Sequence, residues 1–197
     1  MDLKIIFGIL ATCLTLTGYV PYFRDIFVHK TKPHLYTWLV WALTQGTAAF
    51  AMVRGGGKWG AISLFVGTVL VIVIFFLCFK YGTKNIKRSD TIALATALIA
   101  ILVWWQLDNP VLAVLLVSFI DGLGYIPTYR KTYADPSTET VSFWICMIGT
   151  DIFALLANSA HNILTMSYLV TLGICNTVLV GIILFRKRRI TMERTIL

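Results

Sequence analysis

The sequence predicts an all-α membrane protein in which seven transmembrane helices form two parallel three-helix bundles joined by a linker helix. Composition is the first reason. Hydrophobic residues make up 58% of the 197 residues and only 13% are charged, while the mean hydropathy is +0.81. Such a chain is far more apolar than a soluble domain. The second reason is an internal repeat at a constant offset of 106 residues, because parallel repeats build many membrane proteins.

Seven charge-poor windows of 17 to 24 residues match the roughly 20 residues that an α-helix needs to cross a bilayer. They are residues 5–23, 35–53, 59–79, 91–107, 109–129, 140–160 and 162–185. Asn109 is expected to cap the fifth helix, with Pro110 in its first turn. Residues 187–197 form a predicted basic cytoplasmic tail.

The distribution of basic residues predicts the orientation. Fourteen of the 17 Lys and Arg residues fall in one set of connections and in the tail, and only Lys4, Arg54 and Lys58 fall in the opposite set. Because cytoplasmic loops carry the excess of Lys and Arg, we expect the N-terminus outside and the C-terminus in the cytoplasm. The basic residues are spread over short loops, which indicates contacts with a lipid bilayer and no binding of nucleic acid.

The repeat is clearest near the cytoplasmic ends of the first and fifth predicted helices. Residues 18–24 read GYVPYFR and residues 124–130 read GYIPTYR. The offset pairs the first three windows with the last three and leaves the fourth unpaired. One helix between two three-helix units allows both units to have the same orientation in the membrane. The predicted units are a first bundle at 1–80, a linker helix at 91–107 and a second bundle at 109–186.

Each repeat places a proline inside its first helix, at Pro21 and Pro127. A proline removes one backbone hydrogen bond and loosens the preceding helical turn. Two prolines at matching places therefore predict two matching hinges.

Asp121 and Asp151 are the only acidic residues well inside the predicted spans. An ionised carboxylate costs several kcal/mol there unless it is solvated, paired or protonated, so both are candidate proton sites or cavity residues. The structural alternative is a buried Asp hydrogen-bonded to Tyr125 or to a neighbouring helix. Asn176 is the remaining deep polar group, and its repeat counterpart is Leu70.

The second helix of each repeat carries tryptophan beside polar side chains. Indole rings next to amide and carboxyl groups suit a small polar solute. Trp38 and Trp144 lie close to the cytoplasmic ends of their helices, and we favour an aromatic-belt role for these two. Trp41 lies one turn deeper. The candidate substrate-binding residues are Trp41, Gln45, Asp151, Asn158 and Asn176.

No pattern in the chain indicates catalysis or metal binding. The four cysteines fall inside predicted spans without metal-ligand spacing, so we expect no disulfide, no metal and no cofactor. No Ser-His or paired-Asp arrangement has motif support, and the protein is not expected to be an enzyme.

The repeated Gly-Tyr-Val/Ile-Pro-x-Phe/Tyr-Arg segment, followed by a short loop and a Trp-led helix, resembles the PQ-loop superfamily. That group includes the SWEET (MtN3-like) sugar transporters, the half-size SemiSWEETs, lysosomal amino-acid exporters and the KDEL receptor. The resemblance covers essentially the whole chain and implies that Pro21 and Pro127 act as hinges for alternating access. At the positions of the family's Pro-Gln pair, this chain has Pro21-Tyr22 in the first repeat and Pro127-Thr128 in the second. Of the asparagine pair used by SWEETs, only Asn176 has a match.

The leading hypothesis is a transporter that moves a small polar solute, such as a sugar or an amino acid, by alternating access between the two repeats. The alternative is a membrane receptor or adaptor of the same fold that binds a ligand without transporting it. The sequence leaves the substrate and a homo-oligomer open.

Overall fold

The computed structural model describes residues 2–83, 87–106 and 109–196, and within these ranges the chain is helical with no strand. The elements are α1 (Leu3–Phe27), α2 (Leu35–Arg54), α3 (Gly60–Tyr81), α4 (Arg88–Gln106), α5 (Pro110–Ala134), the 3-10 turn η1 (Pro136–Thr138), α6 (Val141–Ala157) and α7 (Ile163–Ile196). Each α-helix in these ranges corresponds to one predicted window. The all-α class is therefore confirmed.

Local chemistry sets the start of α5. The side-chain oxygen of Asn109 accepts hydrogen bonds from the backbone N–H groups of Val111 and Leu112, both at 3.1 Å. Pro110 occupies the first turn, where its missing N–H leaves no intrahelical bond unmade. The predicted cap at Asn109 is confirmed.

Within the described residues, four helices are long and apolar enough to cross a membrane, namely α1, α3, α5 and the Ile163–Met192 part of α7. Helix α6 is apolar but has 17 residues, about 26 Å at 1.5 Å per residue. Large apolar side chains face outward, among them Phe76 at 64% and Phe119 at 65% exposed. Lipid accommodates such a surface better than water does. These are the features of an integral membrane protein.

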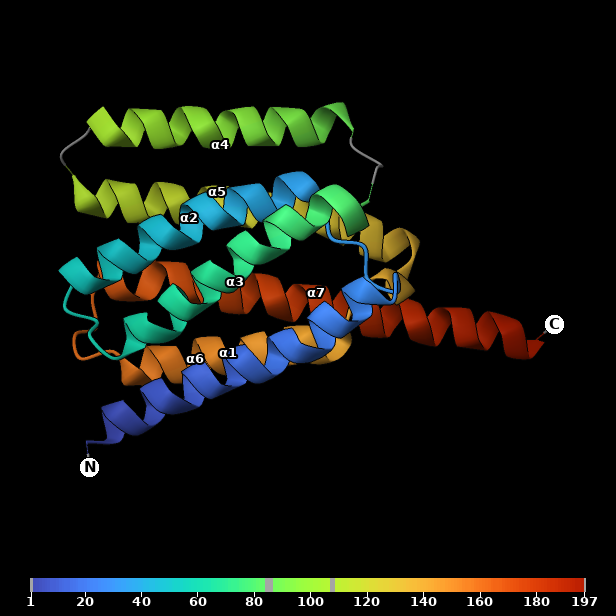
Figure 1. The fold of residues 1–197 in the computed structure, drawn as a ribbon, viewed down its shortest axis with the longest axis horizontal. Coiled ribbons are helices and arrows are strands. Elements are labelled where there is room, and N and C mark those ends of the chain that lie inside the picture. Colours follow the sequence, from blue (N-terminus) through green and yellow to red (C-terminus); the bar gives the residue numbers. More distant parts are fainter. Residues whose placement is uncertain (1, 84–86, 107–108, 197) are drawn as a thin grey trace.

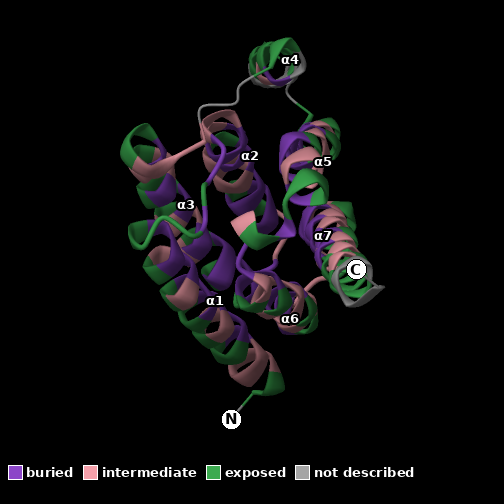
Figure 2. Ribbon diagram, turned by 90° about the vertical axis from the view of Figure 1, so that its right-hand side faces the viewer, coloured by how far each residue is buried: buried purple, intermediate pink, exposed green. Residues whose placement is uncertain are grey.

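The contacts between helices follow the sequence repeat. Helix α3 touches both α1 and α2, and its counterpart α7 touches both α5 and α6. Two further contacts, α1 with α6 and α2 with α5, join the two groups (Figure 2). A shift of 106 residues converts the contact of α1 with α6 into that of α5 with α2, and the reverse. It relates the contact of α2 with α7 to that of α3 with α6 in the same way.

The chain ends lie at opposite ends of the long axis (Figure 1). Connections 28–34 and 135–140 meet at one end, where the Thr31 and Thr140 hydroxyls lie 2.7 Å apart. We call this the basic end, because the connections predicted to be rich in Lys and Arg lie there. Connections 55–59 and 158–162 meet at the opposite end, where the Asn162 amide donates to the Gly55 carbonyl at 2.9 Å.

Helix α4 lies at the edge of the bundle, along α5 and in contact with α2 (Figure 1). It begins at Arg88, slightly before the predicted linker window 91–107, whose last residue is outside the described part. The predicted basic tail is part of α7 as far as residue 196, because α7 continues as one helix to Ile196. The end of α7 projects past the neighbouring helices (Figure 1).

Candidate functional site

A cavity of about 50 Å³ lies between the two groups of helices, and residues of α1, α2, α3, α5, α6 and α7 line it. All of its lining residues lie in helices rather than in the connections. The site is thus built by helices of both halves, and none of the lining residues in the described part of the chain belongs to α4.

Positions related by the repeat line this cavity in pairs. Six lining pairs are 106 residues apart: Thr15 with Asp121, Tyr19 with Tyr125, Trp38 with Trp144, Trp41 with Met147, Gln45 with Asp151, and Ser63 with Leu169. Equivalent faces of the two repeats therefore point inward. In two of these pairs the first half supplies a neutral polar side chain and the second half supplies a carboxylate.

Asp121 of α5 is completely buried and binds side chains of two other helices. Its Oδ1 accepts a hydrogen bond from the Thr44 hydroxyl of α2 and a second, 2.7 Å long, from the Tyr168 hydroxyl of α7. Its Oδ2 is buried and has no hydrogen-bond partner among the residues that the structure describes. Buried polar atoms nearly always have one, so this oxygen requires an explanation.

Asp151 of α6 belongs to a second chain of hydrogen bonds. The Asn176 amide donates to Asp151 Oδ2 at 2.9 Å, and the Tyr125 hydroxyl donates to Asn176 Oδ1 at 2.7 Å. All three side chains are buried. The chain links α6, α7 and α5 along one wall of the cavity.

Aromatic rings form another part of the wall. The Trp41 ring lies 4.6 Å from that of Tyr125 and 5.9 Å from that of Trp144, measured between centroids. Trp38 and Trp144 are each only 2% exposed and line the cavity. The aromatic-belt role favoured for these two is therefore wrong. Both indoles contact rings of the facing repeat, Trp38 that of Phe143 and Trp144 that of Tyr22, with 6.4 and 6.3 Å between centroids.

The structure brings most of the predicted site residues together. Those that line the cavity are Trp41, Gln45, Asp121, Asp151 and Asn176. Asn158 lies apart from it, contrary to the prediction. Helix α6 ends at Ala157, so Asn158 is the residue after the helix, and its amide donates to the Thr165 carbonyl at 2.9 Å. Its role there is to join α6 to the start of α7.

Two residues that hold Asp121 were missed from the sequence. Thr44 recurs in the repeat as Thr150, which itself lines the cavity, so a signal was available. Tyr168 corresponds to Ile62 in the first half, and nothing in the sequence marks it.

Pro21 and Pro127 both lie inside helices that continue past them, α1 to Phe27 and α5 to Ala134. Each follows a tyrosine of the cavity wall by two residues, Tyr19 or Tyr125. A change of helix direction at either proline would therefore move the part of the helix beyond the cavity, toward the basic end. The hinge role stays a prediction.

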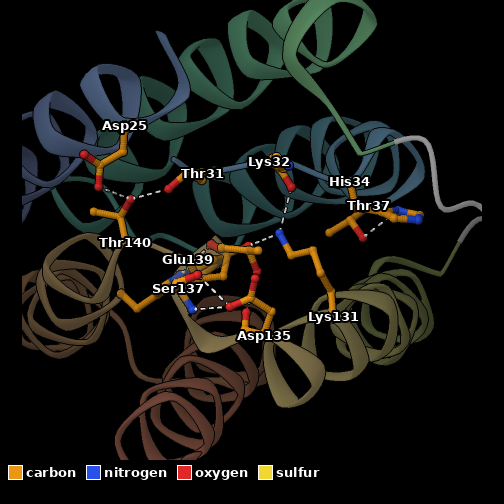
Figure 3. A network of polar contacts seen from close by, with 12 residues as sticks. Asp25, Thr31, Lys32, His34, Thr37, Lys131, Asp135, Ser137, Glu139 and Thr140 are labelled. Atoms are coloured by element: carbon orange, nitrogen blue, oxygen red, sulfur yellow. Dashed lines mark hydrogen bonds and ion pairs between the residues drawn. The ribbon is translucent and has the colours of Figure 1, made fainter. Parts of the chain in front are cut away.

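At the basic end, polar side chains of the two halves bind one another (Figure 3). The Thr140 hydroxyl donates to Asp25 Oδ2 at 2.9 Å and also contacts the Thr31 hydroxyl. All three side chains are buried. These contacts fasten the end of α1 to the start of α6.

Lys131 makes the second connection at this end (Figure 3). Its ammonium group donates to the Lys32 carbonyl at 2.7 Å and to Glu139 Oε1. The other carboxylate oxygen of Glu139 accepts from the Trp144 indole N–H at 3.0 Å. Since Trp144 lines the cavity, the contacts at the basic end reach the cavity wall directly.

Helix α4 is attached through Asp90, outside the predicted linker span. Its carboxylate accepts two hydrogen bonds from Arg130, at 2.9 and 3.0 Å, and lies 3.2 Å from His34 Nε2. Burial raises the pKa of Asp90, but the hydrogen bonds from Arg130 and from the Lys87 N–H outweigh it and lower the pKa to about 2. Burial lowers the pKa of His34, with Lys131 and Arg130 acting in the same direction against Asp90.

Among the described residues, no three His, Cys, Asp or Glu side chains are grouped so that they could hold a metal ion. No family model matches the chain, and no curated protein or solved structure matches it either. The geometry of the cavity is therefore the main guide to the function.

Proposed function

We propose that the protein is an integral membrane transporter of a small polar solute that works by alternating access between two repeats. In this proposal all seven α-helices cross the membrane, with α1 to α3 and α5 to α7 as parallel bundles and α4 as the linker. The resemblance of both Gly-Tyr-x-Pro segments to the PQ-loop superfamily, SWEETs included, supports the same arrangement.

The single observation that carries the proposal is the cavity between the repeats. Six pairs of repeat-related residues line it, so both halves contribute equivalent faces to one polar site in an apolar bundle. Parallel repeats that enclose a site near the middle of the membrane are typical of secondary transporters. The exchange of helix contacts under the 106-residue shift also supports two equivalent bundles.

Contacts between the halves at both ends of the bundle support alternation. At the basic end the Lys131 and Thr140 contacts join the repeats. At the opposite end Asn162 binds Gly55, and the Lys4 ammonium donates to the Ser159 carbonyl at 3.1 Å. A rocking motion about Pro21 and Pro127 would break one set of contacts while the other set holds. This is the requirement for access from one side at a time.

The orientation we propose puts the basic end in the cytoplasm and the N-terminus outside. It rests on the positive-inside rule, since 14 of 17 Lys and Arg residues belong to the connections and the tail of that side.

Uptake by reconstituted proteoliposomes tests the proposal. A panel of sugars, amino acids and amines is offered with and without a pH gradient, and at least one solute should accumulate faster than in empty liposomes. Asp151→Asn should abolish this uptake or its pH dependence, whereas Asp135→Asn, a matched change at an exposed cap of η1, should leave it intact. Unchanged uptake by Asp151→Asn would remove Asp151 from the mechanism.

Binding without uptake of any solute would favour the alternative, a receptor or adaptor of the same fold. The cavity would then be expected to admit reagents from one side of the membrane only.

A further inference from the structure

We propose that the cavity selects a compact organic cation that donates N–H hydrogen bonds, such as a guanidinium or primary ammonium group. This inference rests on the proposed function, since it names the substrate class of the same cavity. The proposed substrate class is narrower than polar solutes in general, because it excludes anions and neutral sugars as the preferred ligands.

The charge of the cavity is the first argument. Asp121 and Asp151 both line it, and none of the described lining residues is Lys, Arg or His. A carboxylate or phosphate that entered would face two acidic side chains with no basic side chain to pair with it. An organic cation finds the opposite charge on either side, in surroundings where Coulomb attraction is weakly screened.

Unpartnered atoms supply the second argument. Asp121 Oδ2 and Gln45 Oε1 are both buried, belong to residues that line the cavity, and have no hydrogen-bond partner in the described part of the chain. Both atoms are acceptors. The partners of Asp121, Thr44 and Tyr168, already donate to Oδ1, so the protein leaves Oδ2 free for a donor. A ligand rich in N–H groups would supply the missing hydrogen-bond donors. An isolated anion or a tertiary amide would not.

The aromatic wall is the third argument. Aromatic residues line the cavity, and the Trp41 ring contacts those of Tyr125 and Trp144. Tyr19 also lines it. The face of an aromatic ring attracts a cation, and the attraction grows when water is excluded. A neutral solute of the same shape gains only the stacking contact.

The size of the cavity limits the ligand. By the measure in which one water needs about 10–15 Å³, a space of about 50 Å³ holds roughly four water-sized groups. A guanidinium group has four heavy atoms and fits this estimate, whereas a hexose does not. Larger amines would place only their cationic group between Asp121 and Gln45 until the repeats separate.

Binding to the intact protein in lipid nanodiscs tests the inference, with quenching of tryptophan fluorescence as the readout. The probes are methylguanidinium, its neutral analogue of the same shape methylurea, tetramethylammonium and acetate. Methylguanidinium should bind saturably and at least tenfold more tightly than methylurea. Tetramethylammonium, which is charged but donates no hydrogen bond, should bind more weakly than methylguanidinium, and acetate should not bind. Equal binding of methylguanidinium and methylurea, or no binding of either, overturns the inference.

Variants locate the binding. Asp121→Asn, which keeps the size of the side chain and removes its charge, should weaken methylguanidinium binding at least tenfold, and Asp135→Asn should leave it unchanged. Gln45→Met removes one acceptor and should weaken binding several-fold. If Asp121→Asn does not fold, the wild-type preference for methylguanidinium over methylurea and the Gln45→Met variant decide the matter. Unaltered binding by the folded variants would place the cation elsewhere and contradict the inference.

The two proposals fail in different ways. If methylguanidinium binds in the cavity with the expected preference but is not carried into proteoliposomes, the cation site stands and the transport function fails. If a sugar or an anion is carried while methylguanidinium neither binds nor competes with it, transport stands and the cation inference fails.

Discussion

The amide of Asn176 donates a hydrogen bond to the carboxylate of Asp151 at 2.9 Å, and both side chains are buried in the cavity wall. Tyr125 donates to the same asparagine from the other side. The repeat counterpart of Asn176 is Leu70, so the first half cannot make an equivalent chain. The two halves share a scaffold and divide the chemistry unequally.

Asn176→Leu, which introduces the residue of the first repeat, should remove the partner of both Asp151 and Tyr125. Leaving buried polar groups unpaired costs about 1–2 kcal/mol of unfolding free energy, and uptake should be lost because Asp151 is no longer held in place. Thr177→Val is the control, since the Thr177 hydroxyl is exposed and bonds only within its own helix. Thermal unfolding in detergent and proteoliposome uptake measure the two effects. An active and fully stable Asn176→Leu variant would show that this chain of hydrogen bonds has no role.

Gly18→Ala should separate α1 from α6. A Cβ at Gly18 would lie 2.7 Å from Cys146 Cβ, closer than two carbon atoms can pack. We expect a loss of about 1–3 kcal/mol, typical of overpacking. At Gly181 nothing lies within 4 Å of the added Cβ, so Gly181→Ala should be neutral or stabilising by about 0.5–1 kcal/mol, because alanine favours the helix. Unfolding midpoints of the two variants that shift in the same direction would contradict the close approach of α1 and α6.

Lys131→Met should loosen the basic end, because the Lys131 ammonium joins the Lys32 carbonyl of one half to Glu139 of the other. Lys30→Met is the matched control. The side chain of Lys30 is 61% exposed in its pair with Asp25, and such surface pairs contribute little.

Spin labels at the exposed positions Val28 and Ala134 report the separation of the two halves there. The distance distribution should broaden toward longer values for Lys131→Met and stay unchanged for Lys30→Met. An unchanged distribution for both variants would mean that Lys131 does not hold this end closed.

His34 should make stability depend on pH near neutrality. Burial lowers its pKa from 6.5, so the unfolded chain takes up the proton more readily than the folded one. The contribution is fully present above about pH 6.5 and is lost as the pH falls below that value. His34→Gln should therefore flatten the decline of the unfolding midpoint between pH 7.5 and about 5.5, whereas the same change at the exposed His161 should not. A decline that persists in His34→Gln would assign it to another group.

Asp90 acts in a separate window. Its pKa is lowered to about 2 from the ordinary 3.8, so the stability that it gives is present above pH 3.8 and is lost as the pH falls toward 2. Acid unfolding of Asp90→Asn should lack this last decline. The two declines begin at different pH values, below about 6.5 for His34 and below 3.8 for Asp90.

The sequence predicts the helices and the inward-facing positions well because hydropathy and the repeat both report on them. The same offset that pairs Gly18 with Gly124 also pairs Gln45 with Asp151, and both of the latter line the cavity. Whether a tryptophan faces lipid or protein depends on the neighbouring helices, so a position near the helix end alone misplaced Trp38 and Trp144.

Two other features lie beyond the reach of sequence patterns. Asn158 does not line the cavity, because α6 ends one residue before it. The ends of a helix are its least predictable part. The contact between Lys131 and the Lys32 carbonyl joins residues 99 positions apart, and no local pattern encodes such a pair.

The central claim is that one cavity between the repeats opens to each side of the membrane in turn. It is tested most directly by cysteine labelling at Ser63, a lining residue on α3, in a variant whose four native cysteines are replaced. Membrane-impermeant maleimide is applied to proteoliposomes from the outside or from the inside. We predict that Ser63→Cys reacts from both sides and that a bound solute slows both reactions. Reaction from one side only would contradict alternating access and favour a receptor.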